Sequence, residues 1–327
     1  QTEASFARAV AGTDLVVGAR SGPVNLMLYS IFRIGDATNN ISWKSYQALA
    51  ANPRIAWTVP LSLGDAHRGF RVLGTTGAYF EHYRTGTDRP LAFSAGAPFK
   101  DVFDAVIGAD VAERLGYRVG QSITIAHGTG DVSFAEHDDK PFRVVGILAP
   151  TGTAVDRTVH VSLEGIEAIH ADWQSGAPIP GLSITPEQAR KLDLAPKAIT
   201  AFLVGVKSKA AIFQLQRQIN EYRDEPLLAV LPGVALQQVW EIVGVAERAL
   251  LLVAAAVALA SLAGLVALHL AALDARRREL AILRALGAPP RSIFGLVIGE
   301  SMLLTVAGAL LGLLALQAGL AIAAPWI

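Results

Sequence analysis

The pattern of apolar and polar residues divides the chain into two parts. Residues 1–248 alternate between short apolar runs and amphipathic stretches separated by Gly, Pro and Asn, which predicts a mixture of strands and helices. Residues 249–273 and 292–320 are apolar or small on every helical face, with few titratable side chains. About 20 such residues suffice for a helix to cross a membrane. We therefore expect a globular domain followed by two transmembrane helices.

The elements predicted in the first part follow the order of a ferredoxin-like unit. Strands are expected at 13–19, 54–63, 198–207 and 226–232, and helices at 43–51 and 209–222. The resulting order is strand, helix, strand, strand, helix, strand, which is the split βαβ arrangement. Residues of about 64–198 interrupt this order and predict a mostly β inserted subdomain. The expected fold class is thus α+β in this domain, followed by transmembrane α-helices.

Two local features of this domain need a structure to interpret them. The strands at 54–63 and 69–76 predict a hairpin that turns around Gly64 and Asp65. The segment 24–34 is too apolar for an ordinary surface loop, so it either packs in the core or forms an exposed patch. Such a patch would contact lipid, a lipidated substrate or a partner protein. Its candidate contact residues are Leu26, Met27, Tyr29, Ile31 and Phe32.

The charge distribution predicts how the chain crosses the membrane. The whole chain has 28 Lys+Arg and 28 Asp+Glu, with a mean hydropathy of +0.40. Residues 1–248 hold 23 basic and 25 acidic residues, whereas the remainder holds five Arg and three acids. All five Arg lie within 276–291, which places 274–291 in the cytoplasm by the positive-inside rule. The domain 1–248 is then extracytoplasmic, and the absence of cysteine fits that location.

Several segments resemble one family of transporters. RRRELAILRALGAPPRSIFGLVIGESMLL (276–304), between two expected spans, resembles the signature of permease subunits in the MacB/FtsX/LolC group of ABC transporters. VLGTTGAYF (72–80), AVIGADVAERLGYRVGQSITI (105–125) and PFRVVGILAPTG (141–152) resemble the MacB-like periplasmic core domain of that group. The family has four transmembrane helices, with this domain between the first two. We therefore expect a first helix before Gln1 and a fourth beyond Ile327.

The resemblance implies a coupling helix within 276–288 that contacts the ATPase. A helix of good helix formers is expected from Glu279 to Leu286, with Gly287 as its cap. The alternative is a basic cluster that only fixes orientation. The expected contact residues are Arg276, Arg277, Arg278, Glu279, Arg284, Ala285 and Gly287.

Glu300 is a second candidate, a carboxylate inside the later span. It is expected about one and a half turns into the helix, near the cytoplasmic face. It either pairs with Arg291 or Arg284 as a hinge or extends toward the lipid headgroups.

The sequence predicts neither a catalytic site nor a metal site. It has no Walker A motif for phosphates and no G-x-S-x-G nucleophile motif. The seven His lack metal-ligand spacing, and the cluster His137, Asp138, Asp139 is more typical of a solvated turn. We expect no cofactor in this chain, with ATP and Mg²⁺ bound by a partner ATPase.

The expected function is a permease subunit in the bacterial inner membrane. It would couple cytoplasmic ATP hydrolysis to motion of its periplasmic domain, and so export or extract a lipoprotein, an amphiphile or a small molecule. Expected partners are the ATPase, a second permease copy, membrane lipids and a periplasmic lipoprotein or adaptor, but no nucleic acid. One alternative is an FtsX-like signalling device that activates a periplasmic partner such as a cell-wall hydrolase. Another is a membrane-anchored scaffold without any ATPase.

Overall fold

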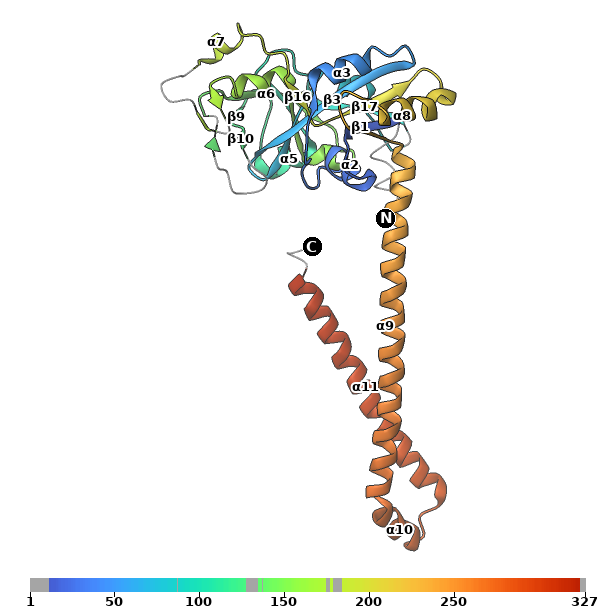
Figure 1. Cartoon of the computed structure of the whole chain (residues 1–327). Coiled ribbons are helices and arrows are strands. Elements are labelled where there is room, and N and C mark those ends of the chain that lie inside the picture. Colours follow the sequence, from blue (N-terminus) through green and yellow to red (C-terminus); the bar gives the residue numbers. More distant parts are fainter. Residues whose placement is uncertain are drawn as a thin grey trace. The chain divides into compact units, whose positions relative to one another are not determined.

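The computed structural model describes residues 12–86, 88–127, 135–136, 138–174, 177–178 and 184–323. Contacts divide the chain into two compact units (Figure 1). Gln1–Ile242 is the N-terminal unit and Val243–Ile327 is the C-terminal unit. The division falls shortly before the first predicted span.

One mixed sheet organises the N-terminal unit and contains twelve of the described strands. Nine of them lie edge to edge in the order β18 (Leu227–Val230), β1 (Leu15–Ala19), β17 (Ala201–Val206), β3 (Ile55–His67), β4 (Phe70–Thr75), β13 (Thr158–Ser162), β8 (Asp104–Ile107), β12 (Phe142–Leu148), β7 (Phe93–Gly96). Off this path lie β9 (Ser122–Ile123), β10 (Ala126–His127) and β11 (Ala135–Glu136). Three short antiparallel pairs are β2 (Ile41–Ser42) with β16 (Ala198–Ile199), β5 (Arg84–Thr85) with β6 (Arg89–Pro90), and β14 (Trp173–Gln174) with β15 (Ala177–Pro178).

The strands β18, β1, β17 and β3 form the predicted ferredoxin-like unit. All three strand pairs in this row are antiparallel. The helices α3 (Trp43–Ala50) and α8 (Ile212–Asn220) connect the strands in the expected βαβ order. Ser42 caps α3, since its hydroxyl accepts a hydrogen bond from the Ser45 N–H at 3.3 Å. The predicted α+β class is therefore confirmed for this unit.

The two faces of this sheet carry different helices because side chains alternate along each strand. In β1, Leu15 and Val17 pack in the cluster that holds α3 and α8, whereas Val16 packs in another cluster. That second cluster contains α2 (Pro23–Ser30) and α4 (Ala78–His82). Figure 1 shows α3 and α2 on opposite sides of the strands.

The apolar segment 24–34 forms α2 and its C-terminal turn, and it lies mostly in the core. Leu26, Met27, Tyr29 and Ile31 are at most 1% exposed. Their assignment as substrate or partner contacts is therefore wrong, because side chains packed against the sheet offer no surface. Phe32 is partly buried and packs at the edge of the same cluster.

The strand β3 joins the ferredoxin-like unit to the insertion. Its first half pairs with β17 and its second half with β4, so it is longer than predicted. The predicted turn at Gly64 and Asp65 is wrong. The chain reverses at Arg68 and Gly69, which both have positive φ (+45° and +81°), as a type I′ hairpin turn requires. The register instead shifts between Leu63 and Ala66, so the Gly64 region marks a bulge within the strand.

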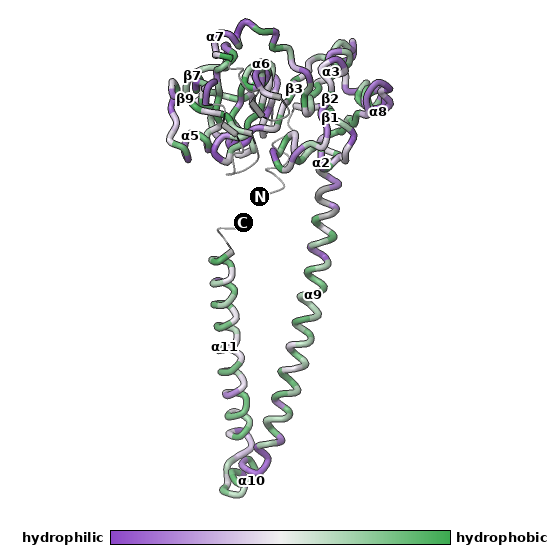
Figure 2. The backbone as a smooth tube through the Cα atoms, turned by 60° about the vertical axis from the view of Figure 1, so that its left-hand side comes forward, coloured by the Kyte–Doolittle hydropathy of each residue, from purple (hydrophilic) through white to green (hydrophobic). Residues whose placement is uncertain are grey.

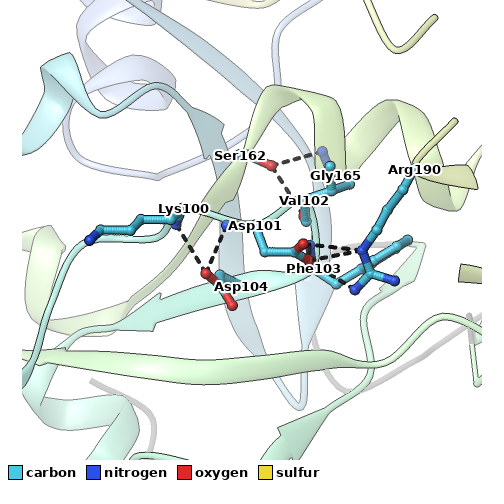
Figure 3. Close-up of polar contacts among 8 residues, drawn as sticks. All are labelled: Lys100, Asp101, Val102, Phe103, Asp104, Ser162, Gly165 and Arg190. Atoms are coloured by element: carbon cyan, nitrogen blue, oxygen red, sulfur yellow. Dashed lines mark hydrogen bonds and ion pairs between the residues drawn. The ribbon is translucent and has the colours of Figure 1, made fainter. Parts of the chain in front are cut away.

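The insertion has a core of its own against the far half of the sheet. Its elements also include η1 (Ala154–Arg157), α5 (Ala109–Leu115), α6 (Leu163–Ile169) and α7 (Pro186–Ala189), while η2 (Lys209–Ala211) precedes α8. Polar contacts fix the segment before β8 (Figure 3). Asp104 accepts the N–H groups of Lys100 and Asp101, at 3.0 and 2.9 Å. Arg190 bonds to Asp101 at 2.9 Å and lowers the pKa of that carboxyl, so the end of α7 is held against the start of β8.

The C-terminal unit consists of long apolar helices and one short polar helix. Its elements are the greater part of α9 (Pro232–Ala275), α10 (Arg277–Ala285) and α11 (Pro290–Ala323). Val243–Ala275 and Pro290–Ile322 are long and apolar enough to cross a membrane, and their most apolar windows are 0% buried. Figure 2 shows hydrophobic residues along α9 and α11 and hydrophilic residues in α10.

Candidate functional site

The short helix α10 has a defined end. It stops at Ala285, and Gly287 follows with a φ of +92°, which glycine adopts without the cost of a Cβ. The Gly287 N–H bonds to the Arg284 carbonyl at 3.1 Å, and the Ala288 N–H bonds to the Leu283 carbonyl at 3.0 Å. These two hydrogen bonds form a Schellman motif. The predicted cap at Gly287 is therefore confirmed, and it fixes where the chain leaves α10.

The charged side chains of α10 face outward. Arg277 pairs with Asp274 at 3.1 Å, with side chains 84% and 72% exposed. Arg278 and Arg284 are exposed and form no ion pair with any residue that the structure describes. Glu279 lies in the first turn, where a carboxylate is favoured by the helix dipole. Contact of these residues with an ATPase stays a prediction.

Glu300 pairs with Arg276 rather than with Arg291 or Arg284. A carboxylate oxygen of Glu300 accepts a hydrogen bond from Nη1 of Arg276, the residue directly after α9. Since α11 starts at Pro290, Glu300 lies nearly three turns into the helix, deeper than predicted. Arg291 is then about 13 Å away along the helix axis, too far for an ion pair within one helix. The Arg276–Glu300 pair thus links the end of α9 to α11.

A cavity of about 280 Å³ lies beside this ion pair. Its wall includes Arg276, Glu279 and Glu300 together with apolar side chains of all three helices. His269 also lines it, and its Nδ1 lies 2.9 Å from the Leu265 carbonyl one turn earlier. A cation, two carboxylates and a histidine therefore meet where α9, α10 and α11 converge.

Exposed apolar side chains also lie on α10 and just after it, and the sequence prediction omitted them. Ile282 is 55% exposed and Leu286 is 80% exposed, and they are spaced four residues apart on one helical face. Leu283 is 40% exposed beside them. The i, i+4 spacing of Ile282 and Leu286 was the signal that could have identified this surface. An exposed apolar surface flanked by charges is typical of a protein contact.

In the N-terminal unit, a strained arginine lies among buried polar groups. Arg33 has a φ of +60°, a conformation that costs a non-glycine residue of order 1–3 kcal/mol. Burial raises the pKa of Tyr79 to about 12, and the Arg33 guanidinium opposes that shift. Burial also lowers the pKa of His160 to about 3, and the charge of Arg33 acts in the same direction. Tyr79 and His160 are thus both neutral near pH 7.

Arg33 also lines a cavity of about 420 Å³ on this unit. The cavity lies between the segment after α2, the turn from β3 to β4, and the segment that leads into η1. Three of its lining residues are arginines, Arg33, Arg71 and Arg157. Nothing in the sequence brought these three positions together, because they are far apart in the chain.

The acidic cluster at 137–139 is described only in part, since His137 lies outside the described residues. Asp139 pairs with Lys140 at 2.5 Å. Lys140 is 0% exposed and also bonds both carboxylate oxygens of Asp172 at 2.8 Å. Asp172 accepts the Ile184 N–H at 3.1 Å as well. These contacts give Asp139 and Asp172 a structural role in holding Lys140.

Comparison with known proteins assigns both parts of the chain to families. Residues 3–222 match the MacB-like periplasmic core domain, and residues 251–327 match the FtsX-like permease C-terminal region. A search among curated proteins found no match.

Two solved structures are similar in part to this chain. The periplasmic region of MacB from Actinobacillus actinomycetemcomitans is 12% identical, with a TM-score of 0.42, covering 72% of this chain and 97% of that one. The extracellular domain of the ABC-type transporter YknZ from Gram-positive bacteria is 11% identical, with a TM-score of 0.38, covering 66% and 98%. The family models carry the assignment, since the first alone spans more than half of the sequence. The chain therefore belongs to the MacB/FtsX-type family of ABC transporter permeases, membrane proteins with a periplasmic domain.

Proposed function

We propose that the chain is a non-catalytic permease subunit that converts ATP hydrolysis by a partner into motion of its N-terminal unit. It lies in the bacterial inner membrane as a dimer with two cytoplasmic ATPase subunits, which bind ATP and Mg²⁺. The chain itself has no Walker A sequence to bind phosphates. The N-terminal unit is periplasmic, and α10 is cytoplasmic, as the Arg cluster at 276–291 favours.

The observation that carries this proposal is the continuity of α9. It is a single helix of 44 residues, from Pro232 to Ala275, without a break at the boundary between the two units. It begins two residues after β18 ends at Val230 and stops one residue before Arg276. A helix of this length spans about 66 Å, roughly twice the hydrocarbon layer. One continuous helix therefore connects the segment after β18 to the residue before α10.

The surface of α10 supports its role as the contact for the ATPase. Glu279 and Arg284 supply exposed charges, while Ile282 and Leu286 supply an apolar centre. Protein interfaces typically combine an apolar centre with a charged rim. We expect the ATPase to present a groove that accepts Ile282 and Leu286.

The substrate we propose is a lipoprotein, an amphiphile or a small molecule already in the periplasm. The burial of Leu26, Met27, Tyr29 and Ile31 removes the apolar patch that would have favoured docking of a cell-wall hydrolase. The same burial also removes these side chains as the lining of a transport cleft, so this segment does not separate transport or extraction from signalling to a periplasmic partner.

The contact is tested by charge reversal on α10. Glu279→Lys and Arg284→Glu should each reduce, at least tenfold, the ATP hydrolysis that candidate lipoproteins, peptides or amphiphilic drugs stimulate in the purified complex. Arg217→Glu is the matched control, since Arg217 is also exposed (79%) but lies on α8. Unchanged stimulation in both α10 variants contradicts the contact. If no ATPase copurifies in mild detergent, the chain is not part of such a transporter.

The role of α9 is tested by breaking its continuity. Ala246→Pro removes a hydrogen bond inside the helix and kinks it, whereas Ala246→Ser keeps the helix intact. Because the chain has no cysteine, Glu113→Cys provides a single label site in each copy of the dimer. We expect ATP to change the distance between the two labels in the Ala246→Ser protein but not in Ala246→Pro. An equal change in both proteins contradicts transmission through α9.

A further inference from the structure

The 420 Å³ cavity of the N-terminal unit is large enough to hold a small ligand. Its volume falls in the range of small-molecule sites. Three guanidinium groups from separate parts of the chain line it: Arg33 after α2, Arg71 on β4 and Arg157 at the end of η1. Arginine is the side chain best suited to bind phosphate, because its planar group donates two parallel hydrogen bonds.

The nearby carboxylates neutralise only part of this positive charge. Asp36 bonds Nη1 of Arg71 at 2.7 Å and so holds that guanidinium in place. Asp156 is 5% exposed, and its carboxylate accepts the N–H groups of Thr151 and Gly152 at 2.8 and 2.7 Å. Arg157 is exposed and forms no ion pair within the part of the chain that the structure describes. Even with both carboxylates counted, the three arginines leave a net positive charge.

The Arg33 side chain lies partly in the cavity wall and partly among buried polar groups. Its Nε and Nη1 are buried and have no hydrogen-bond partner among the described residues. The Tyr79 hydroxyl lies beside it, where a hydrogen bond with Arg33 opposes the rise of the Tyr79 pKa, and the buried His160 Nε2 has no partner among the described residues. Both groups are neutral near pH 7, because burial raises the pKa of Tyr79 to about 12 and lowers that of His160 to about 3, so neither balances the charge of Arg33. The fold thus holds a cation in a strained backbone conformation, and no carboxylate among the described residues forms an ion pair with it.

The rest of the cavity wall is partly apolar. Phe70 is buried, Phe32 is partly buried, and Ile34 is 54% exposed. An inorganic anion would leave the cavity-facing parts of these side chains uncovered, whereas an anion with an apolar substituent would cover them.

We propose that this cavity binds a phosphate monoester with an apolar substituent, with Arg33, Arg71 and Arg157 around the phosphate and Phe32, Ile34 and Phe70 against the substituent. Two sources share this chemistry, the phosphate headgroup of a lipid and a soluble organic phosphate. The site does not depend on coupling to an ATPase, since all its residues belong to the N-terminal unit.

The binding experiment uses the full chain in a neutral maltoside detergent and titration calorimetry. Phenyl phosphate should bind saturably and at least tenfold more tightly than inorganic phosphate, and phenol should not bind. Competition against bound phenyl phosphate then distinguishes a lipid headgroup from a soluble organic phosphate. Stronger displacement by dihexanoyl phosphatidic acid than by glycerol phosphate supports a lipid headgroup, and the reverse supports a soluble phosphate. The absence of saturable phenyl phosphate binding by folded protein overturns the proposal.

Variants locate the binding in this cavity. Arg157→Gln changes an exposed side chain, so it should fold normally and weaken phenyl phosphate binding at least tenfold. Arg33→Gln should weaken it further, with circular dichroism as the check that the variant folds. The matched control is Arg114→Gln, an exposed arginine in the last turn of α5, which should bind like the unchanged chain. Equal binding by Arg157→Gln and Arg114→Gln overturns the proposal.

Discussion

The N-terminal and C-terminal units use the same apolar residues in opposite ways. Leu203 in β17 is 0% exposed, whereas Leu303 in α11 is 70% exposed. The first unit covers its apolar side chains with its own helices and sheet, so it has the core that independent stability requires. The helices of the second unit leave theirs uncovered, so lipid or other protein must cover them.

Charged residues show the same contrast. Lys140 in the N-terminal unit is 0% exposed and lies between two carboxylates. Arg276 and Glu300 in the C-terminal unit are 49% and 43% exposed. A buried charge must keep its partner, whereas an exposed charge is stabilised by solvent or headgroups as well. The comparison predicts large effects of substitution in the first unit and small effects in the second.

The largest effect is expected from breaking the buried ion pair. Lys140→Met leaves Asp172, which is 4% exposed, without its cation and should reduce the free energy of unfolding by about 3–5 kcal/mol. Urea unfolding in neutral detergent, followed by tryptophan fluorescence, measures this loss. The double variant Lys140→Met, Asp172→Leu should recover most of it, because it removes both buried charges. If the single variant loses less than about 1 kcal/mol of unfolding free energy, Asp172 becomes hydrated in that variant.

A matched pair of leucine truncations tests the contrast directly. Leu203→Ala creates a cavity in the sheet core and should cost about 2–5 kcal/mol in the same urea experiment. Leu303→Ala removes the same atoms from an exposed position on α11 and should change stability by less than about 0.5 kcal/mol. Similar losses in both variants would mean that α11 is packed against protein as tightly as the core is.

An intermediate effect on the free energy of unfolding is expected when the pH is lowered. His160 has a pKa of about 3 in the native state and of about 6.5 when unfolded, so the unfolded state binds more protons between these values. Its contribution to stability is complete above about pH 6.5 and is lost as the pH falls, by about 2 kcal/mol at pH 5. His160→Asn keeps a neutral polar group at every pH. It should therefore remove this part of the dependence of the unfolding free energy on pH. The same slope in both proteins would contradict the assignment of a neutral, buried histidine.

The smallest effect on stability is expected from the Arg276–Glu300 ion pair. Glu300→Gln should shift the unfolding midpoint of the full chain in detergent only slightly, because the described residues do not enclose the pair and it lies at the end of α9, within reach of detergent headgroups. A double-mutant cycle with Arg276→Gln measures the interaction between them. A clear coupling energy in the assembled complex, absent from the isolated chain, would show that assembly buries the pair.

Most of the N-terminal fold could be predicted because its signals are local. The cap at Ser42 and the apolar strands of the ferredoxin-like unit depend on neighbouring residues alone. The extension of β3 past Gly64 could not be predicted, because it depends on pairing with β4 and β17. The burial of α2 was also undecided, since an apolar stretch alone does not indicate which surface covers it.

The candidate sites divide in the same way. The charges of α10 and the cap at Gly287 follow from the sequence, because they lie within one short segment. The predicted partners of Glu300 were wrong. Arg276 pairs with it instead, from the junction between α9 and α10. The arginine cavity was missed for a related reason. Arg33, Arg71 and Arg157 meet only after the sheet has formed.

The placement of β18 has a mechanical consequence. This edge strand precedes α9 by two residues, and its neighbour in the sheet is β1. A force that pulls on α9 therefore acts on β18 first. It is then transmitted through the strand pairs to β1, β17 and β3. Because β3 runs through both halves of the sheet, the tension reaches the insertion along one continuous backbone. The pairing of β18 with β1, which spans four residues, is therefore the first contact within the sheet that such a force would test.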